Sequence, residues 1–389
     1  MQRALLEARK GVGRTAPNPP VGAVVVRGAL LLGTGFHAKA GERHAEVVAL
    51  DDAKAKGHDV RGATLHVTLE PCAHHGRTPP CVQRVMAEGI GRVVIGAVDP
   101  NLRVHGKGID ALRAAGIEVA VLEERAVLGE ECRALIEPFA RATVEGRPYV
   151  VLKIASSLDG RIATANGASR WITGSAARAL VHRLRDAVDA VVVGAGTVLA
   201  DDPSLTVRDA RAASDGGTRD PMRVVIDSAL RTSPTSRVYQ ARAGERAPVV
   251  VHAPGAERAL MDAFDAAGVR RLVREADVDV APSAARAAPA GGAHVDLAGA
   301  LRALVPLGVM AVLLEAGPGL ATAALAAGIV DELWWFQAPL LLGADAQPAV
   351  GPLALSAPAD GPRFTAVHRA IIGEDALVIL AAHRLHGVR

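Results

Sequence analysis

Short hydrophobic runs alternate with amphipathic segments along the first third of the chain. Five runs have the length and composition of buried strands, at 21–26, 30–36, 63–69, 92–97 and 117–121. Segments with helical spacing of apolar residues lie between or after them, at 44–56, 81–88, 108–115 and 126–142. Alternation of strand and helix predicts an α/β domain in which helices cover a sheet.

A polar stretch, V-E-G-R-P at 144–148, interrupts this pattern and predicts two domains, at 1–145 and 146–389. Strand-like runs resume beyond it, at 149–155, 190–194, 223–227, 248–252, 311–315 and 332–338. Helical segments separate these runs, so the second domain is also expected to be α/β. The segments 209–220 and 281–293 are rich in Ala, Gly, Asp or Pro and are predicted to be loops.

Composition narrows the class of partner. Half of the 389 residues are hydrophobic, only 3% are aromatic, and the net charge is +3 without a basic arm. Proteins that bind nucleic-acid strands usually combine a basic groove with stacking aromatics, so polymeric nucleic acid is not the expected partner. The small positive net charge is compatible with an anionic small molecule as the substrate.

Targeting signals and disulfides are not expected. Residues 1–10 have the pattern of an amphipathic helix rather than of a secretory signal. No charge-free apolar stretch of about 18 residues is present, which argues against a membrane span. Three cysteines do not make a disulfide framework. A cytoplasmic protein is therefore predicted.

Four residues have the layout of a catalytic zinc site. His44, Cys72 and Cys81 supply one imidazole and two thiolates, which leaves the fourth tetrahedral position of Zn²⁺ for water. Glu46 is placed to move protons to and from that water. This combination predicts hydrolytic deamination of a nucleobase-like ring.

A structural zinc site is the alternative. Eight residues separate Cys72 from Cys81, whereas generic zinc deaminases carry P-C-x-x-C. His74 or His75 in that interval could supply a fourth ligand and close the site. Glu46 has no role in a closed site, and Cys81 at a helix start favours the thiolate. The thiolate favours metal binding, and the presence of Glu46 favours catalysis.

The stretch T-L-E-P-C-A-H-H-G-R-T-P-P-C at 68–81 resembles the deaminase half of the bifunctional riboflavin-biosynthesis deaminase/reductases. In that family the long cysteine spacing is characteristic, and A-P-N-P-P-V-G-A-V-V-V and V-D-P-N strengthen the resemblance. It implies a cytidine-deaminase-like three-layer α/β/α domain that deaminates 2,5-diamino-6-ribosylamino-4(3H)-pyrimidinone 5′-phosphate. It also implies substrate contacts from Asn18, His37, Arg77, Asp99 and Asn101.

Glycine-containing turns mark the second domain. V-V-V-G-A-G-T-V-L-A-D-D-P and V-L-L-E-A-G-P-G-L-A-T-A-A-L each follow a strand, and the second leads directly into a helix. The start of that helix is suited to holding a phosphate. Neither turn matches the full G-x-G-x-x-G fingerprint, so an ordinary strand-to-helix turn is the alternative.

The same family resemblance extends across the second domain through the runs at 153–160, 169–173 and 201–208. It implies a dihydrofolate-reductase-like α/β domain that uses NADPH to convert the ribosyl group to ribityl. The implied cofactor contacts are Ala155, Trp171, Thr197, Asp201, Ser228, Gly317, Pro318, Gly319 and Leu320. The implied substrate contacts are Ser169, Arg185, Leu205, Arg208 and Glu315. Lys153 and Asp201 are the candidates for assisting proton transfer during ring opening.

Two positions depart from the family pattern, since Ala316 stands where a second glycine is frequent and Leu340 where a lysine is frequent. Cys132 lies away from every motif and is predicted to be structural. Related enzymes are often homo-oligomers, which is the expectation here. The rival hypotheses are a tRNA-type zinc deaminase with an accessory domain, and a binding or regulatory protein whose zinc is structural.

Overall fold

The chain forms two compact units, residues 1–146 and 147–389, in a computed structural model. The structure describes residues 1–73, 79–123, 125–208, 219–242, 244–274 and 295–382. The predicted loop at 281–293 and residues 209–218 of the other predicted loop lie outside these ranges. No helix in the described part of the chain is long and apolar enough to cross a membrane.

Unit 1 is built on a five-stranded sheet. Its order is β2 (Leu30–Phe36), β1 (Gly22–Arg27), β3 (Thr64–Val67), β4 (Arg92–Ile95) and β5 (Glu118–Val121). β1 runs antiparallel to β2 and β3, whereas β3, β4 and β5 are parallel. All five strands coincide with the hydrophobic runs predicted from the sequence.

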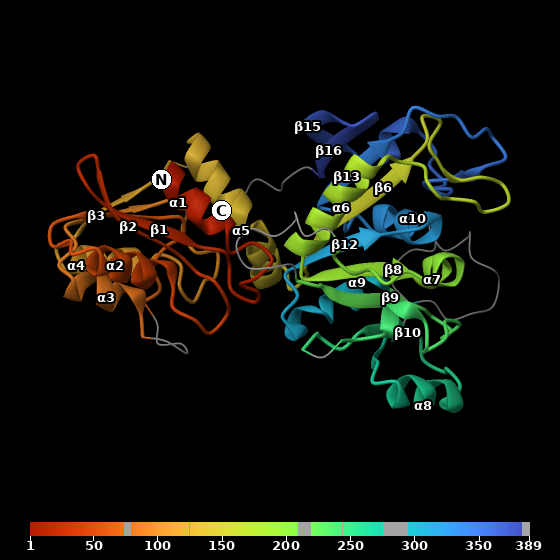
Figure 1. Ribbon diagram of the computed structural model, residues 1–389, viewed down its shortest axis with the longest axis horizontal. Helices are drawn as coiled ribbons and strands as arrows, with labels where there is room; N and C mark the ends of the chain where they lie inside the picture. The colour runs from red at the N-terminus through yellow and green to blue at the C-terminus, as the bar shows by residue number, and fades with distance from the viewer. Residues whose placement is uncertain (74–78, 124, 209–218, 243, 275–294, 383–389) are drawn as a thin grey trace. The chain divides into compact units, whose positions relative to one another are not determined.

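Helices cover both faces of this sheet (Figure 1). One core contains residues of α2 (Ala45–Ala55), α3 (Cys81–Ala87) and α4 (Lys107–Ala114). A second core contains residues of α1 (Gln2–Arg9) and α5 (Val127–Val144), including the fully buried Cys132. The predicted three-layer α/β/α arrangement is confirmed.

Two glycines of β2 bring α2 unusually close to the sheet. A Cβ atom on Gly33 would lie 2.3 Å from the carbonyl oxygen of Ala49, and one on Gly35 would lie 2.4 Å from the Ala49 nitrogen. Only glycine therefore permits this approach of helix and strand backbones. The close contact fixes the start of α2, which carries His44 and Glu46.

Unit 2 is built on a nine-stranded sheet whose central strands are parallel, as in Figure 1. Seven neighbouring strands run parallel, and two further strands are added antiparallel at one edge. The order is β11 (Arg270–Val273), β10 (Val249–His252), β9 (Met222–Ile226), β8 (Ala190–Gly194), β12 (Ala311–Glu315), β6 (Tyr149–Ser156), β13 (Glu332–Gln337), β16 (Asp375–Ala382) and β15 (Phe364–Ile372). A separate pair consists of β7 (Arg161–Ala163) and β14 (Gln347–Pro348).

The parallel strands of unit 2, apart from the edge strand β11, are covered on both faces. In β6, Val150 and Leu152 pack in the core that includes α9 (Leu297–Arg302) and α10 (Pro318–Ala326), whereas Val151 faces the opposite core. That opposite core receives side chains from α7 (Ala195–Asp201) and α8 (Arg258–Ala266). Burial on both sides explains why these strands read as unbroken apolar runs in the sequence. The α/β prediction for this domain is confirmed.

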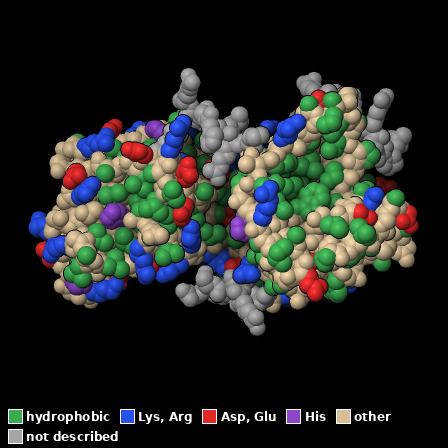
Figure 2. Space-filling view, turned by 90° about the horizontal axis from the view of Figure 1, so that it is seen from above, with side chains coloured by type: hydrophobic (Ala, Val, Ile, Leu, Met, Phe, Trp, Pro, Cys, Tyr) green, Lys and Arg blue, Asp and Glu red, His purple; other side chains and the backbone are tan. Residues whose placement is uncertain are grey.

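The edge strands of unit 2 were missed by the sequence reading. β15 is largely exposed, with Val367 and Ile371 59% and 72% exposed, so it carries no buried apolar run. Figure 2 shows hydrophobic side chains gathered in a broad patch on the surface of this unit. A strand that is held by hydrogen bonds to its neighbour and is not buried has no apolar run by which the sequence would indicate it.

Candidate active sites

The predicted zinc ligands of unit 1 come together in space. His44 caps the N-terminus of α2, Cys81 is the first residue of α3, and Cys72 follows β3. The His44 Nδ1 atom lies 3.1 Å from the Cys81 sulfur and 3.6 Å from the Cys72 sulfur. The backbone N–H of Cys81 donates to the Cys72 sulfur at 3.3 Å, which fixes that side chain against the helix start.

This donor set fits a zinc ion. The three ligand atoms all lie within 4.8 Å of one another, and His44 presents the same nitrogen to both sulfurs. A tetrahedral zinc ion with Zn–S of about 2.3 Å and Zn–N of about 2.1 Å holds such atoms roughly 3.6–3.8 Å apart. Small movements of the side chains are therefore enough to bind the metal.

The electrostatics of the ligand cluster favour a thiolate at Cys72, whereas the hydrogen bond with Cys72, together with burial, raises the pKa of Cys81. The hydrogen bond from Cys81, aided by the neighbouring His44, lowers the pKa of Cys72 well below its ordinary value. The hydrogen bond with Cys72 in turn favours protonation of His44 and raises its pKa. A thiolate is the form of cysteine that binds metal, so the cluster already holds one anionic ligand.

Glu46 lies beside the ligands without being one of them. It occupies the first turn of α2 and its side chain is buried. Burial, reinforced by the nearby Cys72 thiolate, raises the pKa of Glu46 to about 7. A carboxyl group with a pKa near neutrality can both accept and release a proton.

A cavity of about 400 Å³ opens onto this cluster. Glu46, His44 and Cys72 line it, and so do four of the five predicted substrate contacts: Asn18, His37, Asp99 and Asn101. The fifth, Arg77, lies outside the described residues, and so do His74 and His75.

Hydrogen bonds orient two of these side chains. His37 is buried, and its Nδ1 atom lies 3.1 Å from the Arg43 carbonyl oxygen, to which it donates. This tautomer leaves Nε2 to accept from the Asn18 amide at 3.0 Å. Burial lowers the pKa of His37 and keeps the ring neutral. The arrangement leaves the Asn18 carbonyl oxygen as a hydrogen-bond acceptor for a ligand.

The sequence reading missed Glu70 as part of this cavity. Its side chain is buried and lines the cavity together with Leu69, Val104 and Phe139. Glu70 stands two residues before Cys72 in the motif at 68–81, so its position was visible although its role was not.

Unit 2 contains a second cavity, of about 550 Å³, at the carboxyl ends of its central strands. Eleven of the predicted residues line it: Lys153, Ala155, Ser169, Trp171, Arg185, Thr197, Asp201, Leu205, Arg208, Glu315 and Gly317. Four others do not, of which Pro318, Gly319 and Leu320 form the first turn of α10. The remaining one, Ser228, follows β9, and its hydroxyl accepts the Val295 N–H at 3.3 Å.

A buried carboxylate organises the cations of this cavity. Glu315, at the end of β12, accepts two hydrogen bonds from the Arg185 guanidinium, at 2.5 and 3.0 Å. The Lys153 ammonium lies 3.6 Å from the same carboxylate. Burial opposes the charged form of Glu315, but Arg185 and Lys153 outweigh it and hold its pKa at about 2. The group therefore stays ionised and fixes both cations.

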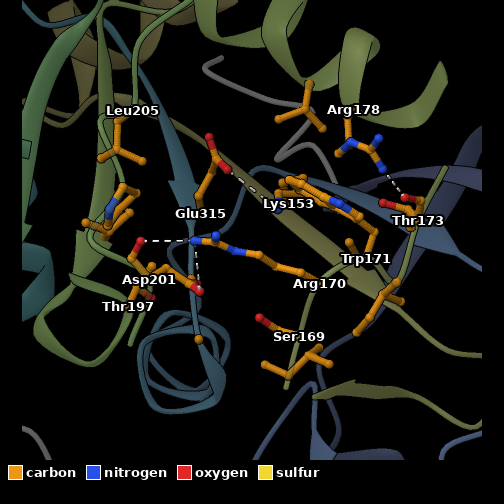
Figure 3. A pocket seen from close by; sticks show the side chains of 18 of the residues that line it. Lys153, Ser169, Arg170, Trp171, Thr173, Arg178, Thr197, Asp201, Leu205 and Glu315 are labelled. Carbon is orange, nitrogen blue, oxygen red and sulfur yellow. Dashed lines mark hydrogen bonds and ion pairs between the residues drawn. The ribbon is translucent and has the colours of Figure 1, made fainter. Parts of the chain in front are cut away.

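In Figure 3 the Arg170 side chain extends across the cavity toward Asp201. The Arg170 guanidinium donates to the Asp201 carbonyl oxygen at 3.1 Å and lies 3.8 Å from its carboxylate. The next residue, Asp202, accepts the backbone N–H of Arg237 at 2.8 Å. These contacts fix the loop that follows α7.

Helix α6 (Ser175–Ala187) presents one face to the cavity. Arg178, His182 and Arg185 share that face because they follow the i, i+4, i+7 spacing of a helix, and all three line the cavity. The Arg178 guanidinium stacks 4.2 Å from the ring centre of Trp171 and donates to the Thr173 carbonyl at 2.6 Å (Figure 3). The sequence reading named only Arg185, although the spacing could have indicated Arg178 and His182.

The first turn of α10 fits a phosphate group. Gly317 is its N-cap, no side chain caps it, and a Cβ atom on Gly319 would meet nothing within 4 Å. The N–H groups of this nine-residue helix are thus open to an anion at the positive end of the helix dipole. Ala316 lines the cavity and packs on the core, whereas Leu340 is not among the lining residues described.

Family models match both units. Residues 148–378 match the RibD C-terminal domain, and residues 1–97 match the cytidine and deoxycytidylate deaminase zinc-binding region. The first match alone covers more than half of the chain.

Whole-length relatives agree with these matches. The riboflavin biosynthesis protein RibD of Escherichia coli (strain K12) is 39% identical over 94% of this chain and 93% of its own length. The RibD protein of Aquifex aeolicus (strain VF5) is 39% identical over 88% of this chain and 87% of its own. A Thermotoga maritima structure described as a diaminohydroxyphosphoribosylaminopyrimidine deaminase/5-amino-6-(5-phosphoribosylamino)uracil reductase superposes with a TM-score of 0.80 at 36% identity, over 98% of this chain and 97% of its own.

Proposed function

The chain belongs to the RibD family of bifunctional pyrimidine deaminases and reductases of riboflavin biosynthesis, and we propose that its two cavities catalyse the two reactions. The cavity of unit 1 deaminates 2,5-diamino-6-ribosylamino-4(3H)-pyrimidinone 5′-phosphate. The cavity of unit 2 then reduces the ribosyl group of the deaminated product to ribityl. The observation that carries the proposal is the His44, Cys72 and Cys81 cluster beside Glu46, in one chain with a cationic second cavity.

Deamination depends on a small set of residues. Zinc held by His44, Cys72 and Cys81 would lower the pKa of the attacking water. Glu46 accepts a proton from that water and returns it to the amine nitrogen as ammonia leaves. The buried position of Glu46 beside the ligands keeps bulk water from competing for this proton.

The remaining cavity residues of unit 1 select the pyrimidine. The amide of Asn18 is held by neutral His37, so its carbonyl oxygen is free to accept a hydrogen bond from the amino groups of the ring. Asp99 and Asn101 line the same cavity and offer further polar groups to the substrate. Arg77 is proposed to meet the substrate phosphate, since a guanidinium matches phosphate geometry.

Reduction depends on alignment and charge. NADPH, when bound, supplies the hydride that the anomeric carbon of the ribosyl group receives. Ala155, Trp171, Thr197, Asp201 and Ser228 would hold it, and the turn at 317–320 would receive its phosphates. The Lys153 Nζ atom lies 3.6 Å from the Glu315 carboxylate and is proposed to donate a proton to the ring oxygen as the sugar opens.

The charges of the second cavity support a phosphorylated substrate. Five arginines and one lysine line it against three carboxylates. Arg185 is held by Glu315, and Arg208 lies in the same cavity with Ser169 and Leu205. Guanidinium groups held in this manner bind phosphate with little loss of side-chain freedom.

We also propose that the protein is a homo-oligomer. The edge strand β15 exposes Val367 and Ile371, and an apolar edge of this kind is usually covered by another chain. Light scattering that gives the mass of a single chain, 40.1 kDa, would contradict this proposal.

The test of the function uses the purified, zinc-loaded protein. Incubation with the diaminopyrimidine ribotide alone is expected to release ammonia and to yield only the deaminated ribosyl product, identified by its mass. Addition of NADPH is expected to convert that product to the ribityl compound. Ammonia release from a nucleic-acid substrate instead, without NADPH oxidation, would overturn the proposal.

A further inference from the structure

Glu70 is a buried carboxylate that the proposed mechanism leaves unused. Its side chain is 4% exposed and lies in the cavity of unit 1, two residues before Cys72. Its Oε2 atom accepts the backbone N–H groups of Asp99 and Gly106 at 3.2 and 3.0 Å. Its Oε1 atom accepts those of Gly108 and Ile109 at 2.8 and 3.3 Å. One side chain thus binds both ends of the segment 99–106.

The segment between those ends is internally ordered. Asp99 accepts the Asn101 N–H on its carboxylate at 2.8 Å, and its carbonyl oxygen accepts from the His105 ring at 3.0 Å. The Asn101 carbonyl accepts the N–H groups of Val104 and His105 at 2.8 and 2.9 Å. The loop that carries Asp99 and Asn101 is therefore a closed unit whose two ends both meet Glu70.

Glu70 also joins this loop to the metal-binding segment. A Cβ atom on Gly108 would lie 2.0 Å from the Pro71 carbonyl oxygen, so the start of α4 lies directly against the Glu70–Pro71 backbone. Cys72 is the next residue along that backbone. Movement of the segment 99–109 relative to Cys72 would therefore break the contacts of Glu70 first.

We propose that Glu70 is a positioning residue for deamination, which holds Asp99 and Asn101 at a fixed distance from the Cys72 ligand. The proposal rests on the proposed function, because it assigns Asp99 and Asn101 to the pyrimidine substrate. It predicts that loss of the Glu70 charge weakens substrate binding while the metal and the proton-transfer step are kept.

A purely structural role is the competing explanation, because a carboxylate near the start of α4 also stabilises that helix. The two roles differ in what they change. A structural role lowers the stability of unit 1 without a selective effect on substrate binding. A positioning role raises KM and leaves kcat and zinc content nearly intact, since substrate binding depends on the loop and proton transfer on Glu46.

The decisive variant is Glu70→Gln in the full-length, zinc-loaded protein. It keeps the size of the side chain but loses the charge and turns an amide NH₂ toward backbone N–H donors. The KM of deamination is expected to rise about tenfold, equivalent to roughly 1.4 kcal/mol. kcat is expected to stay within about twofold and zinc content to remain full.

The matched control is Glu7→Gln. Glu7 is a buried carboxylate of the same unit, paired with Arg3 and Lys10 at 3.2 and 2.8 Å, and it makes no described contact with the segment 99–109. Its KM is expected to match the wild type. Should Glu70→Gln fail to fold, Glu70→Asp keeps the charge on a shorter side chain, and faster amide hydrogen exchange confined to 99–109 is the expected result.

A double-mutant cycle separates the inference from the function it rests on. If Glu70 acts through Asn101, the KM of Glu70→Gln combined with Asn101→Ala should barely exceed that of Asn101→Ala alone. Additive effects, or an unchanged KM in Glu70→Gln with an active wild type, would overturn the inference alone. A wild type that releases no ammonia from the diaminopyrimidine ribotide would overturn the proposed function instead.

Discussion

The two cavities of this protein differ in how their metal-binding and charged groups are arranged. In unit 1 the metal-binding groups come from 44–81, and the described lining residues of that cavity include neither lysine nor arginine. In unit 2 the lining residues are spread from Lys153 to Ala349, and arginines dominate among its charged groups. The first cavity concentrates its chemistry at one metal and one carboxylate, whereas the second distributes charge over a wide surface.

This difference follows from the two reactions. Deamination changes bonds at a single ring carbon, so a compact donor set with one proton carrier is sufficient. In the function proposed here, reduction must align two phosphorylated molecules, and each phosphate needs cations or helix N-termini to replace its water. The activity of a compact site should be lost when one residue is changed. The activity of a distributed site should fall by a part with each residue that is changed.

The compact site is tested most severely by Glu46→Gln. Ammonia release is expected to fall about 10³-fold, because the variant removes the group that carries the proton. Zinc content, measured by atomic absorption, is expected to stay unchanged since Glu46 is not a ligand. NADPH oxidation with pre-deaminated substrate serves as the control and is expected to match the wild type. Loss of both activities together would contradict the independence of the two sites.

Glu315→Gln tests whether the cavity of unit 2 depends on one central carboxylate. The variant leaves buried Arg185 without its partner, and breaking such a pair is expected to destabilise unit 2 by about 3–5 kcal/mol. All three tryptophans lie in unit 2, so urea unfolding followed by tryptophan fluorescence reports on that unit. Reduction is expected to fall strongly while ammonia release is kept.

The pH dependence of stability gives a second measure of Glu315. Its pKa of about 2 lies below the ordinary value of 4.5, so its contribution is present above pH 4.5 and is lost as the pH falls toward 2. The difference in unfolding free energy between wild type and Glu315→Gln should therefore shrink over that window. A constant difference from pH 4.5 to 2 would show that the carboxylate is not held ionised.

Arg178→Met tests a peripheral part of the distributed site. The variant removes the cation stacked on Trp171, a contact worth about 0.5–1 kcal/mol at an exposed site, and Trp171 is 67% exposed. The affinity for NADPH is expected to fall about two- to fivefold, measured by quenching of tryptophan fluorescence.

Arg183→Met is the control for that measurement. Arg183 lies on the same helix, is exposed, and does not belong to the lining residues of the cavity. Its NADPH affinity is expected to equal that of the wild type. An equal loss in both variants would attribute the effect to helix α6 rather than to the stack on Trp171.

Prediction from sequence succeeded where burial or a rare residue type leaves a recognisable pattern along the chain. The strands of unit 1 and the parallel strands of unit 2 other than β11 are apolar because they are buried, and this made them readable. The set His44, Glu46, Cys72 and Cys81 was readable because metal ligands are rare residue types at restrictive spacings. β15 was not readable because it is largely exposed and carries no buried apolar run. The role of Glu70 was not readable because its partners lie 29 to 39 residues away along the chain.

By itself the sequence determined the two α/β domains, the zinc donor set and the family of the chain. Those properties are carried by residue type, spacing and periodicity, which folding does not change. Only the tertiary structure decided that Glu315 joins Lys153 to Arg185, that α6 turns Arg178 and His182 to the same cavity, and that Glu70 holds both ends of the segment 99–106. A buried charge is stable only beside its partners, and packing chooses those partners across the whole chain.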